Sequence, residues 1–192
     1  MTHALRAEAR QVRESLAREA AQHHLRWSFA VRHGDVTTEL VAAVVAGDLL
    51  VLGRTRAGTT KRPPVGSTVR GVVSCCAHSV LVVPGGGRAD GPVVVVYDAA
   101  SGPGALAMGA AFARAEDREL LVLVAEEPLR ADVEAALAAT GRPGRVEGAA
   151  GAAVTRVLAE LARAGTPMLV LGRSAATDPV LESVICPTVI VG

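Results

Sequence analysis

The sequence predicts an α/β protein composed of two halves with mostly parallel sheets. Hydrophobic residues make up 50% of the 192 residues, whereas aromatic residues make up only 2%. Valine, leucine and alanine must therefore fill the core, which is typical of parallel sheets covered by helices. Short valine- and leucine-rich runs alternate with segments of helical spacing, and this order predicts βαβ crossovers.

The first half is expected to alternate helices and strands. Apolar residues between positions 4 and 22 recur every three or four residues, as in an amphipathic helix. Residues 25–32 alternate apolar and polar side chains, which is the pattern of a half-exposed strand. The elements expected next are a helix capped by Asp35 and ending at Gly47, a strand over 48–52, a polar loop over 53–66, a helix over 67–77 and a strand over 80–83.

A linker with three consecutive glycines (PGGGRADGP, residues 84–92) separates the two halves. We therefore divide the chain into a first half over residues 1–84, a linker over 85–92 and a second half over 93–192. The elements expected in the second half are strands over 93–97, 120–124, 145–148, 168–171 and 188–191, with helices over 104–115, 129–139, 152–164 and 179–185.

An internal repeat supports this division. The string LVLGR at Leu50–Arg54 recurs 119 residues later at Leu169–Arg173, and Ser79–Val83 is matched 108 residues later by Pro187–Val191. Repeats of this kind indicate duplicated structural units. The second half is 11 residues shorter between its two matched segments, so it has lost the loop that follows Gly53 in the first half.

The glycine-rich loop resembles that of the universal stress protein family. Nucleotide-binding members carry a glycine, two residues, a second glycine, nine residues, and then a glycine with serine or threonine. Here Gly53 is followed in this register by Arg56, in place of the second glycine, and then by Gly66 and Ser67.

The surrounding segments extend the resemblance over nearly the whole chain. Residues 31–54 are similar to the family's third strand, third helix and fourth strand, and residues 66–83 to its last helix and strand. Residues 93–101 (VVVVYDAAS) resemble its first strand, and Cys186-Pro187 its common entry to the last strand. The resemblance implies Rossmann-like or flavodoxin-like halves of the adenine nucleotide alpha hydrolase type.

Two departures from the family pattern concern the strands and the loop. The first half lacks the family's first strand, first helix and second strand. These elements either lie upstream of Met1, or are supplied by another chain, or leave this half as a degenerate cap. The second half lacks the glycine-rich loop, so Asp98, whose counterpart in the family lies near adenine, faces no phosphate loop of its own.

The candidate nucleotide site lies where the loop meets the next helix. Backbone N–H groups at a glycine-lined helix N-terminus can converge on a phosphate, and nearby arginines add positive charge. Both residues also have a structural interpretation that needs no ligand: Ser67 is an ordinary helix cap, and Asp98 caps the helix that follows it. The candidate cofactor-binding residues are Gly53, Arg54, Arg56, Gly66, Ser67, Thr68 and Asp98.

Several function classes find no support in the sequence. With 20 basic and 19 acidic residues, nucleic acid and anionic membranes are not expected partners. The charged N-terminal segment and the short apolar runs predict a cytoplasmic protein without a spanning helix. The three cysteines are expected to be packed thiols rather than a metal site. No motif groups catalytic side chains, so we expect no enzyme.

Three hypotheses of function follow from these observations. The first is a stress-response or signalling module that binds ATP or AMP, with Mg²⁺, weakly through the first-half loop. The second is an interaction scaffold of the same fold without nucleotide, and the third, ranked last, is a nucleotide-hydrolysing enzyme. The resemblance also implies that Val80–Val83 and Thr188–Val191 pair antiparallel within the chain, as a pseudo-dimer, and it leaves a homodimer open.

Overall fold

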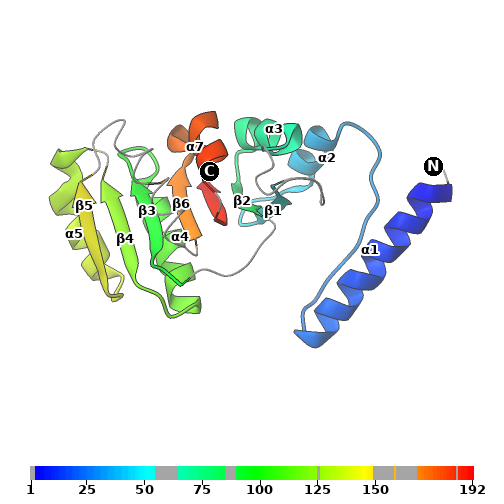
Figure 1. Cartoon of the computed structure of the whole chain (residues 1–192), viewed down its shortest axis with the longest axis horizontal. Coiled ribbons are helices and arrows are strands. Elements are labelled where there is room, and N and C mark those ends of the chain that lie inside the picture. Colours follow the sequence, from blue (N-terminus) through cyan, green and yellow to red (C-terminus); the bar gives the residue numbers. More distant parts are fainter. Residues whose placement is uncertain are drawn as a thin grey trace. The chain divides into compact units, whose positions relative to one another are not determined.

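The computed structural model describes residues 3–54, 65–84, 90–124, 126–148, 158, 168–184 and 186–192. The chain divides into two compact units, Met1–Glu39 and Leu40–Gly192, and each unit is described by itself. The predicted α/β class is confirmed, because one seven-stranded, mostly parallel sheet runs through the second unit (Figure 1). The assignment of the halves to residues 1–84 and 93–192 stays a prediction.

The first unit contains one long helix and an extended segment. Helix α1 spans His3–Gln22 and confirms the expected amphipathic helix. The strand expected over residues 25–32 is wrong: these residues belong to no helix or strand. A strand needs the backbone of a neighbour to pair with, and no described strand pairs with this segment.

Helix α2 spans Val36–Ala43 and begins in the first unit. Asp35 caps it, as expected, because its Oδ1 accepts hydrogen bonds from the backbone N and the hydroxyl of Thr38, both at 2.9 Å. These hydrogen bonds hold the pKa of Asp35 below its ordinary value. The helix ends earlier than the expected boundary at Gly47.

The sheet of the second unit has the strand order β1-β2-β7-β6-β3-β4-β5. Helices α3, α4, α5 and α7 span Ser67–Cys75, Gly102–Ala115, Arg130–Ala139 and Asp178–Ser183. Short 3-10 helices are η1 (Glu127–Leu129) and η2 (Arg173–Ala175). The strands are β1 (Leu49–Gly53), β2 (Ser79–Val83), β3 (Val93–Tyr97), β4 (Leu120–Val124), β5 (Gly144–Gly148), β6 (Met168–Gly172) and β7 (Thr188–Val191).

One strand pair joins the two parts of the sheet. β2 pairs antiparallel with β7, in a register that places Val80 opposite Ile190 and Val82 opposite Thr188. The antiparallel pairing expected for these two segments is therefore present. All other pairs in the sheet are parallel. The linker residues 85–89, between β2 and β3, lie outside the described residues.

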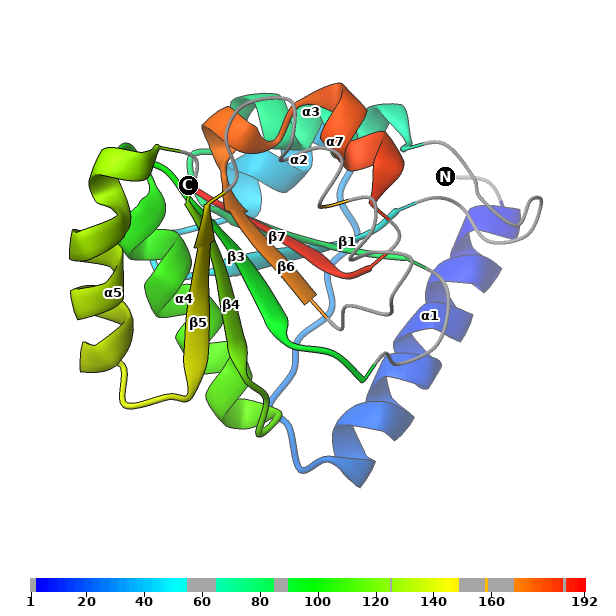
Figure 2. The same ribbon diagram turned by 60° about the vertical axis from the view of Figure 1, so that its left-hand side comes forward.

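Aliphatic side chains fill the core on both faces of the sheet. On one face α3 and α7 contribute Val72 and Leu181 to one buried cluster, and on the other α4 and α5 contribute Ala105 and Val133 to a second (Figure 2). Gly109 lets α4 approach the sheet, because a Cβ there would lie 2.3 Å from Val95 Cγ2. Within the described residues, no helix combines the length and apolarity needed to cross a bilayer.

The two arginines of the repeated Gly-Arg sequence follow β1 and β6. Each donates hydrogen bonds to backbone carbonyls on the opposite side of the β2–β7 pair. Arg54, which follows β1, is 7% exposed and donates hydrogen bonds to the carbonyls of Val184 and, at 3.1 Å, Glu182. Arg173, which follows β6, donates to the carbonyls of Val73 and, at 3.2 Å, His78. Arg54 follows β1 of the β1–β2 block and thus reaches α7, the helix before β7. Arg173 follows β6 of the other, five-stranded block and reaches α3, the helix before β2. We call this reciprocal arrangement the arginine latch.

The latch satisfies carbonyls at the carboxyl ends of helices. Glu182 and Val73 belong to the last turns of α7 and α3, where carbonyls have no partner inside the helix. The partial negative charge at a helix carboxyl end also favours a cation there. Arg70 of α3 adds ion pairs to Asp178, at 3.2 Å, and to Glu182 of α7. The repeated arginines therefore have a structural role at the junction of the sheet.

Replacing either latch arginine is expected to lower stability. Arg54→Ala and Arg173→Ala should each lower the free energy of unfolding by about 2 kcal/mol, because each leaves two carbonyls without a charged donor. Urea unfolding followed by circular dichroism measures this change. Arg145→Ala is the matched control, because the Arg145 side chain is 57% exposed and pairs only with Glu147 within β5 among the described residues. Equal losses in all three variants would contradict the latch.

Candidate functional site

The first-half loop begins and ends at the carboxyl end of β1. Gly53 ends β1, and Gly66 precedes α3 with an extended backbone (φ −65°, ψ 152°). The two ends are joined by a hydrogen bond of 3.2 Å from the Gly66 backbone N to the Arg54 carbonyl. Ser67 is exposed and Thr68 half-buried in the first turn of α3. The structure therefore brings Gly53, Gly66, Ser67 and Thr68 together.

Arg54, expected from the sequence to be a candidate phosphate ligand, donates its side-chain hydrogen bonds to backbone carbonyls. Arg54 lies at the carboxyl end of β1, but its guanidinium is buried and donates to carbonyls of α7 and the residue after it. Its guanidinium therefore belongs to the arginine latch. Arg56, and with it the middle of the loop over residues 55–64, lies outside the described residues.

Asp98 follows β3 and its carboxylate accepts four hydrogen bonds. Oδ1 accepts from the backbone N of Ala100 (3.0 Å) and from the backbone N and hydroxyl of Ser101 (both 2.7 Å). Oδ2 accepts from the Ser174 hydroxyl at 2.7 Å. Burial raises the pKa of Asp98, but the hydrogen bonds from Ser174, Ser101 and Ala100 outweigh it and hold the pKa below its ordinary value.

Asp98 sits at the point where the strand order of the sheet reverses. β4 and β5 lie on one side of β3 and β6 and β7 on the other, and ligands of α/β sheets bind in the crevice at such a point. Here β6 is followed directly by η2, and the Ser174 hydroxyl of η2 donates a hydrogen bond to Asp98 Oδ2. The space is also tight, since a Cβ on Gly172 would lie 1.5 Å from Ser101 Oγ. The Asp98 carboxylate is therefore already engaged by Ser101 and Ser174 at this point of the sheet.

The structure does not bring Asp98 to the first-half loop. Three strands (β2, β7 and β6) lie between β1 and β3, which corresponds to about 19 Å at the usual strand spacing. A nucleotide whose phosphates lie at Gly66 therefore cannot use Asp98 of the same chain for its base. Ser174 escaped the sequence analysis, although its place directly after the repeated Gly-Arg was a signal that could have identified it.

Metal and thiol chemistry find little support in the described part of the chain. No group of three histidine, cysteine or carboxylate side chains there could hold a metal ion. The three cysteines are free, with Cys76 and Cys186 buried and Cys75 exposed. Burial raises the pKa of the Cys186 thiol to about 11, so Cys186 is protonated at neutral pH and unreactive.

The hydrogen bonds around Asp98 predict a pH-dependent contribution to stability. A carboxylate with a lowered pKa stabilises the fold above the pKa it has in the unfolded chain, and this stabilisation is lost as the pH falls through the folded-state pKa. Asp98→Asn should therefore lower the free energy of unfolding by about 1 kcal/mol at pH 7, a modest value because the side chain is partly exposed.

The difference between wild type and Asp98→Asn should shrink as the pH falls from about 5 to about 2. Urea unfolding at several pH values measures it. Asp90→Asn is the control, since the Asp90 side chain is 94% exposed. A difference that stays constant over this pH range would show that the carboxylate charge plays no part.

Comparisons with known proteins link the first part of the chain to a family. Residues 1–84 match the model of the Universal stress protein family. No curated protein matches the sequence. Among solved structures, a universal stress protein from Archaeoglobus fulgidus is similar with a TM-score of 0.78 and 18% sequence identity, over 96% of this chain and 78% of that one.

A second similar structure is a protein of unknown function from Pseudomonas aeruginosa, with a TM-score of 0.67 and 13% identity, over 94% of this chain and 76% of that one. At these identities the likeness of the structures shows the fold alone. The similarity to the universal stress protein family thus covers residues 1–84, and the solved structures show that a similar α/β fold extends through nearly the whole chain.

Proposed function

We propose that this universal-stress-protein-like chain is a stress-response or signalling module that binds the phosphates of ATP or AMP weakly at the N-terminus of α3. The observation that carries the proposal is the junction of Gly53 and Gly66, held by the hydrogen bond between Gly66 and Arg54. It sets the first turn of a nine-residue helix at the carboxyl end of a parallel strand. Helix N-termini in this position favour anions.

The hydroxyls of Ser67 and Thr68 support an anion site at this end of α3. Both residues belong to the first turn, and neither is fully buried. Gly66 leaves the backbone open, and no side chain caps the helix among the described residues. Phosphate oxygens would then receive backbone N–H and hydroxyl hydrogen bonds, with Mg²⁺ offsetting the remaining charge of ATP.

We expect the affinity for nucleotide to be weak, because Arg54 and Asp98 already have hydrogen-bond partners within the protein. Arg54 donates to carbonyls of the other block, so its charge is not wholly available to a phosphate. Asp98 already accepts four hydrogen bonds and lies three strands away. Phosphate contacts therefore have to supply most of the binding free energy, without recognition of the base by Asp98.

A second candidate function is an interaction scaffold of the same fold that binds no nucleotide. It is favoured by the Asp98 carboxylate, which accepts hydrogen bonds from the hydroxyls of Ser101 and Ser174. It is also favoured by large apolar side chains on the surface, including Leu25 (63% exposed) and Val51 (55% exposed). Hydrolysis of nucleotide ranks third, because no catalytic base has been assigned.

Calorimetric titration with Mg-ATP and with AMP tests the proposal. Wild type should show saturable binding, and Gly66→Asp should weaken it at least about tenfold, because a carboxylate at this cap repels phosphate. The variant should fold, since Asp is a favourable helix cap and a Cβ at position 66 meets only the Arg54 carbonyl, at 3.6 Å.

Thr177→Asp is the matched control for this experiment. It introduces the same charge at the cap of α7, the corresponding helix in the repeat, and should leave binding within about twofold of wild type. No saturable heat with wild type would leave the scaffold as the better hypothesis. Equal binding by Gly66→Asp and wild type would move the site away from α3, and release of ADP during the titration would revive the enzyme hypothesis.

A further inference from the structure

Arg70 of α3 is a charged side chain that lies beside the proposed phosphate site. Its backbone N donates to the Gly66 carbonyl at 3.1 Å, so Arg70 lies about one helical turn after the glycine that precedes α3. Long side chains on a helix point back towards its N-terminus, and Arg70 Nε accordingly donates to the Val65 carbonyl at 3.3 Å. A guanidinium therefore lies at the end of α3 where phosphate is expected.

Two carboxylates of α7 hold this guanidinium. Arg70 Nη2 pairs with Glu182 Oε1, and Nη1 pairs with Asp178 Oδ2 at 3.2 Å. The Asp178 side chain is 62% exposed, whereas that of Glu182 is 36% exposed, so solvent screens the pair with Asp178 more strongly. Among the described residues, Glu182 is therefore the stronger anionic partner of Arg70.

Glu182 also contacts the other end of the first-half loop. Its backbone carbonyl accepts a hydrogen bond of 3.1 Å from Arg54, which directly follows Gly53. Arginines at both ends of the loop thus converge on one residue of α7. Arg54 is 7% exposed and donates to backbone carbonyls, whereas the Arg70 side chain is 40% exposed and pairs with carboxylates. Arg70 is therefore the arginine that a phosphate arriving from solvent reaches.

A carboxylate and a phosphate bind a guanidinium in the same way. Each presents oxygen atoms to the planar fork of N–H groups on arginine, so the same N–H groups cannot serve both anions at full strength. Glu182 is part of the chain and loses no translational freedom when it pairs with Arg70. A phosphate is held in addition by the backbone N–H groups at the N-terminus of α3. The two anions are therefore matched competitors.

We propose that Arg70 is a further ligand of the nucleotide phosphates, and that the Glu182 carboxylate competes with them for its guanidinium. This inference rests on the proposed nucleotide site at α3. In the free protein the ion pair holds the guanidinium beside the site. When nucleotide binds, the Nη groups turn from Glu182 to the phosphate, and the affinity is lowered by the cost of breaking the ion pair. Nucleotide binding thereby also removes an ionic contact between α3 and α7.

Calorimetric titration with Mg-ATP in a double-mutant cycle tests this competition. Glu182→Gln should strengthen binding at least about threefold, because the amide no longer competes as an anion. Arg70→Gln should weaken binding at least about fivefold, because the phosphate loses a charged donor. In the double variant, Glu182→Gln should change binding by less than about twofold, because its effect requires Arg70. Glutamine keeps helix propensity at both positions, and circular dichroism checks that each variant folds.

Glu127→Gln is the matched control for the loss of a carboxylate. Glu127 belongs to η1, which follows β4, and pairs with Arg130 at 2.6 Å. The variant therefore breaks a comparable ion pair and changes the net charge by the same amount as Glu182→Gln. It should leave binding within about twofold of wild type.

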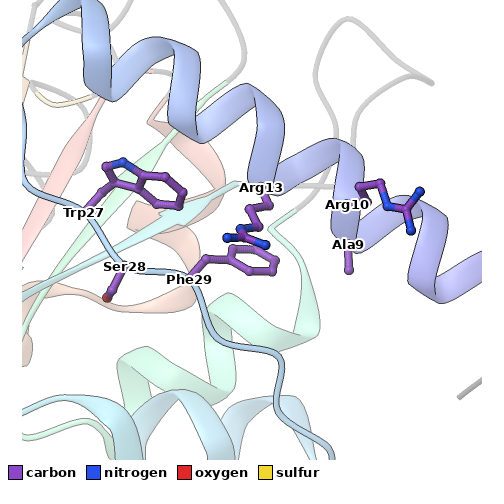
Figure 3. A pocket seen from close by; sticks show the side chains of 6 residues that line it. All are labelled: Ala9, Arg10, Arg13, Trp27, Ser28 and Phe29. Carbon is purple, nitrogen blue, oxygen red and sulfur yellow. The ribbon is translucent and has the colours of Figure 1, made fainter.

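Arg13→Gln is the control for a different location of the nucleotide. The first unit has an open groove of about 580 Å³, lined by Ala9, Arg10, Arg13, Trp27, Ser28 and Phe29, and Figure 3 shows Arg13 near the Phe29 ring. Arginines and aromatic rings together also suit a nucleotide. Because the proposed site lies at α3, Arg13→Gln should leave binding within about twofold of wild type.

The outcomes separate this inference from the proposed function. No saturable heat with wild type would overturn both. Binding that is lost in Gly66→Asp but unchanged in Arg70→Gln would overturn the inference alone. Equal strengthening by Glu182→Gln with and without Arg70 would show direct repulsion of the nucleotide, and equal strengthening by Glu127→Gln would show an effect of net charge; either result overturns the competition. Weaker binding by Arg13→Gln would move the nucleotide to the groove and overturn it as well.

Discussion

The antiparallel pairing of β2 with β7 is the constraint on which the second unit depends. It joins a two-stranded block to a five-stranded block whose strands are otherwise all parallel. Without it, the edges of β2 and β7 would both present unpaired backbone and valine side chains to solvent. The arginine latch lies on either side of this pair and ties each block to the helix of the other. The junction is therefore held by backbone pairing and by charged hydrogen bonds together.

Much of this arrangement could be predicted from the sequence, because it depends on local patterns. Strand β3, with Val93–Tyr97 buried throughout, follows from an uninterrupted apolar run, and β5 was placed within one residue of its observed start. The segment over 25–32 shows where such reasoning fails. Its alternation fits a strand, but pairing depends on a neighbour, and the local pattern does not reveal whether a neighbour is there.

The site could be predicted only in part, for a similar reason. Gly66 and Ser67 were identified from spacing, and the fold places them at a strand end as that spacing requires. Arg54 looked like a phosphate ligand because it follows Gly53, yet its partners are carbonyls about 130 residues away along the chain. The sequence around an arginine in a loop does not show whether its side chain binds a phosphate or a backbone carbonyl. The same holds for Asp98, whose fourth hydrogen bond comes from Ser174 across the strand reversal.

The position of β7 at the end of the chain bears on how the protein is made. During synthesis β1 and β2 are complete long before the residues that cover the β2 edge, since Val80 pairs with Ile190. At ordinary translation rates the uncovered edge persists on the order of ten seconds, with the apolar sequence SVLVV on it. Over that interval the nascent chain is open to pairing with other nascent chains on the same message. The β2 edge is therefore an aggregation hazard that lasts until β7 has been made.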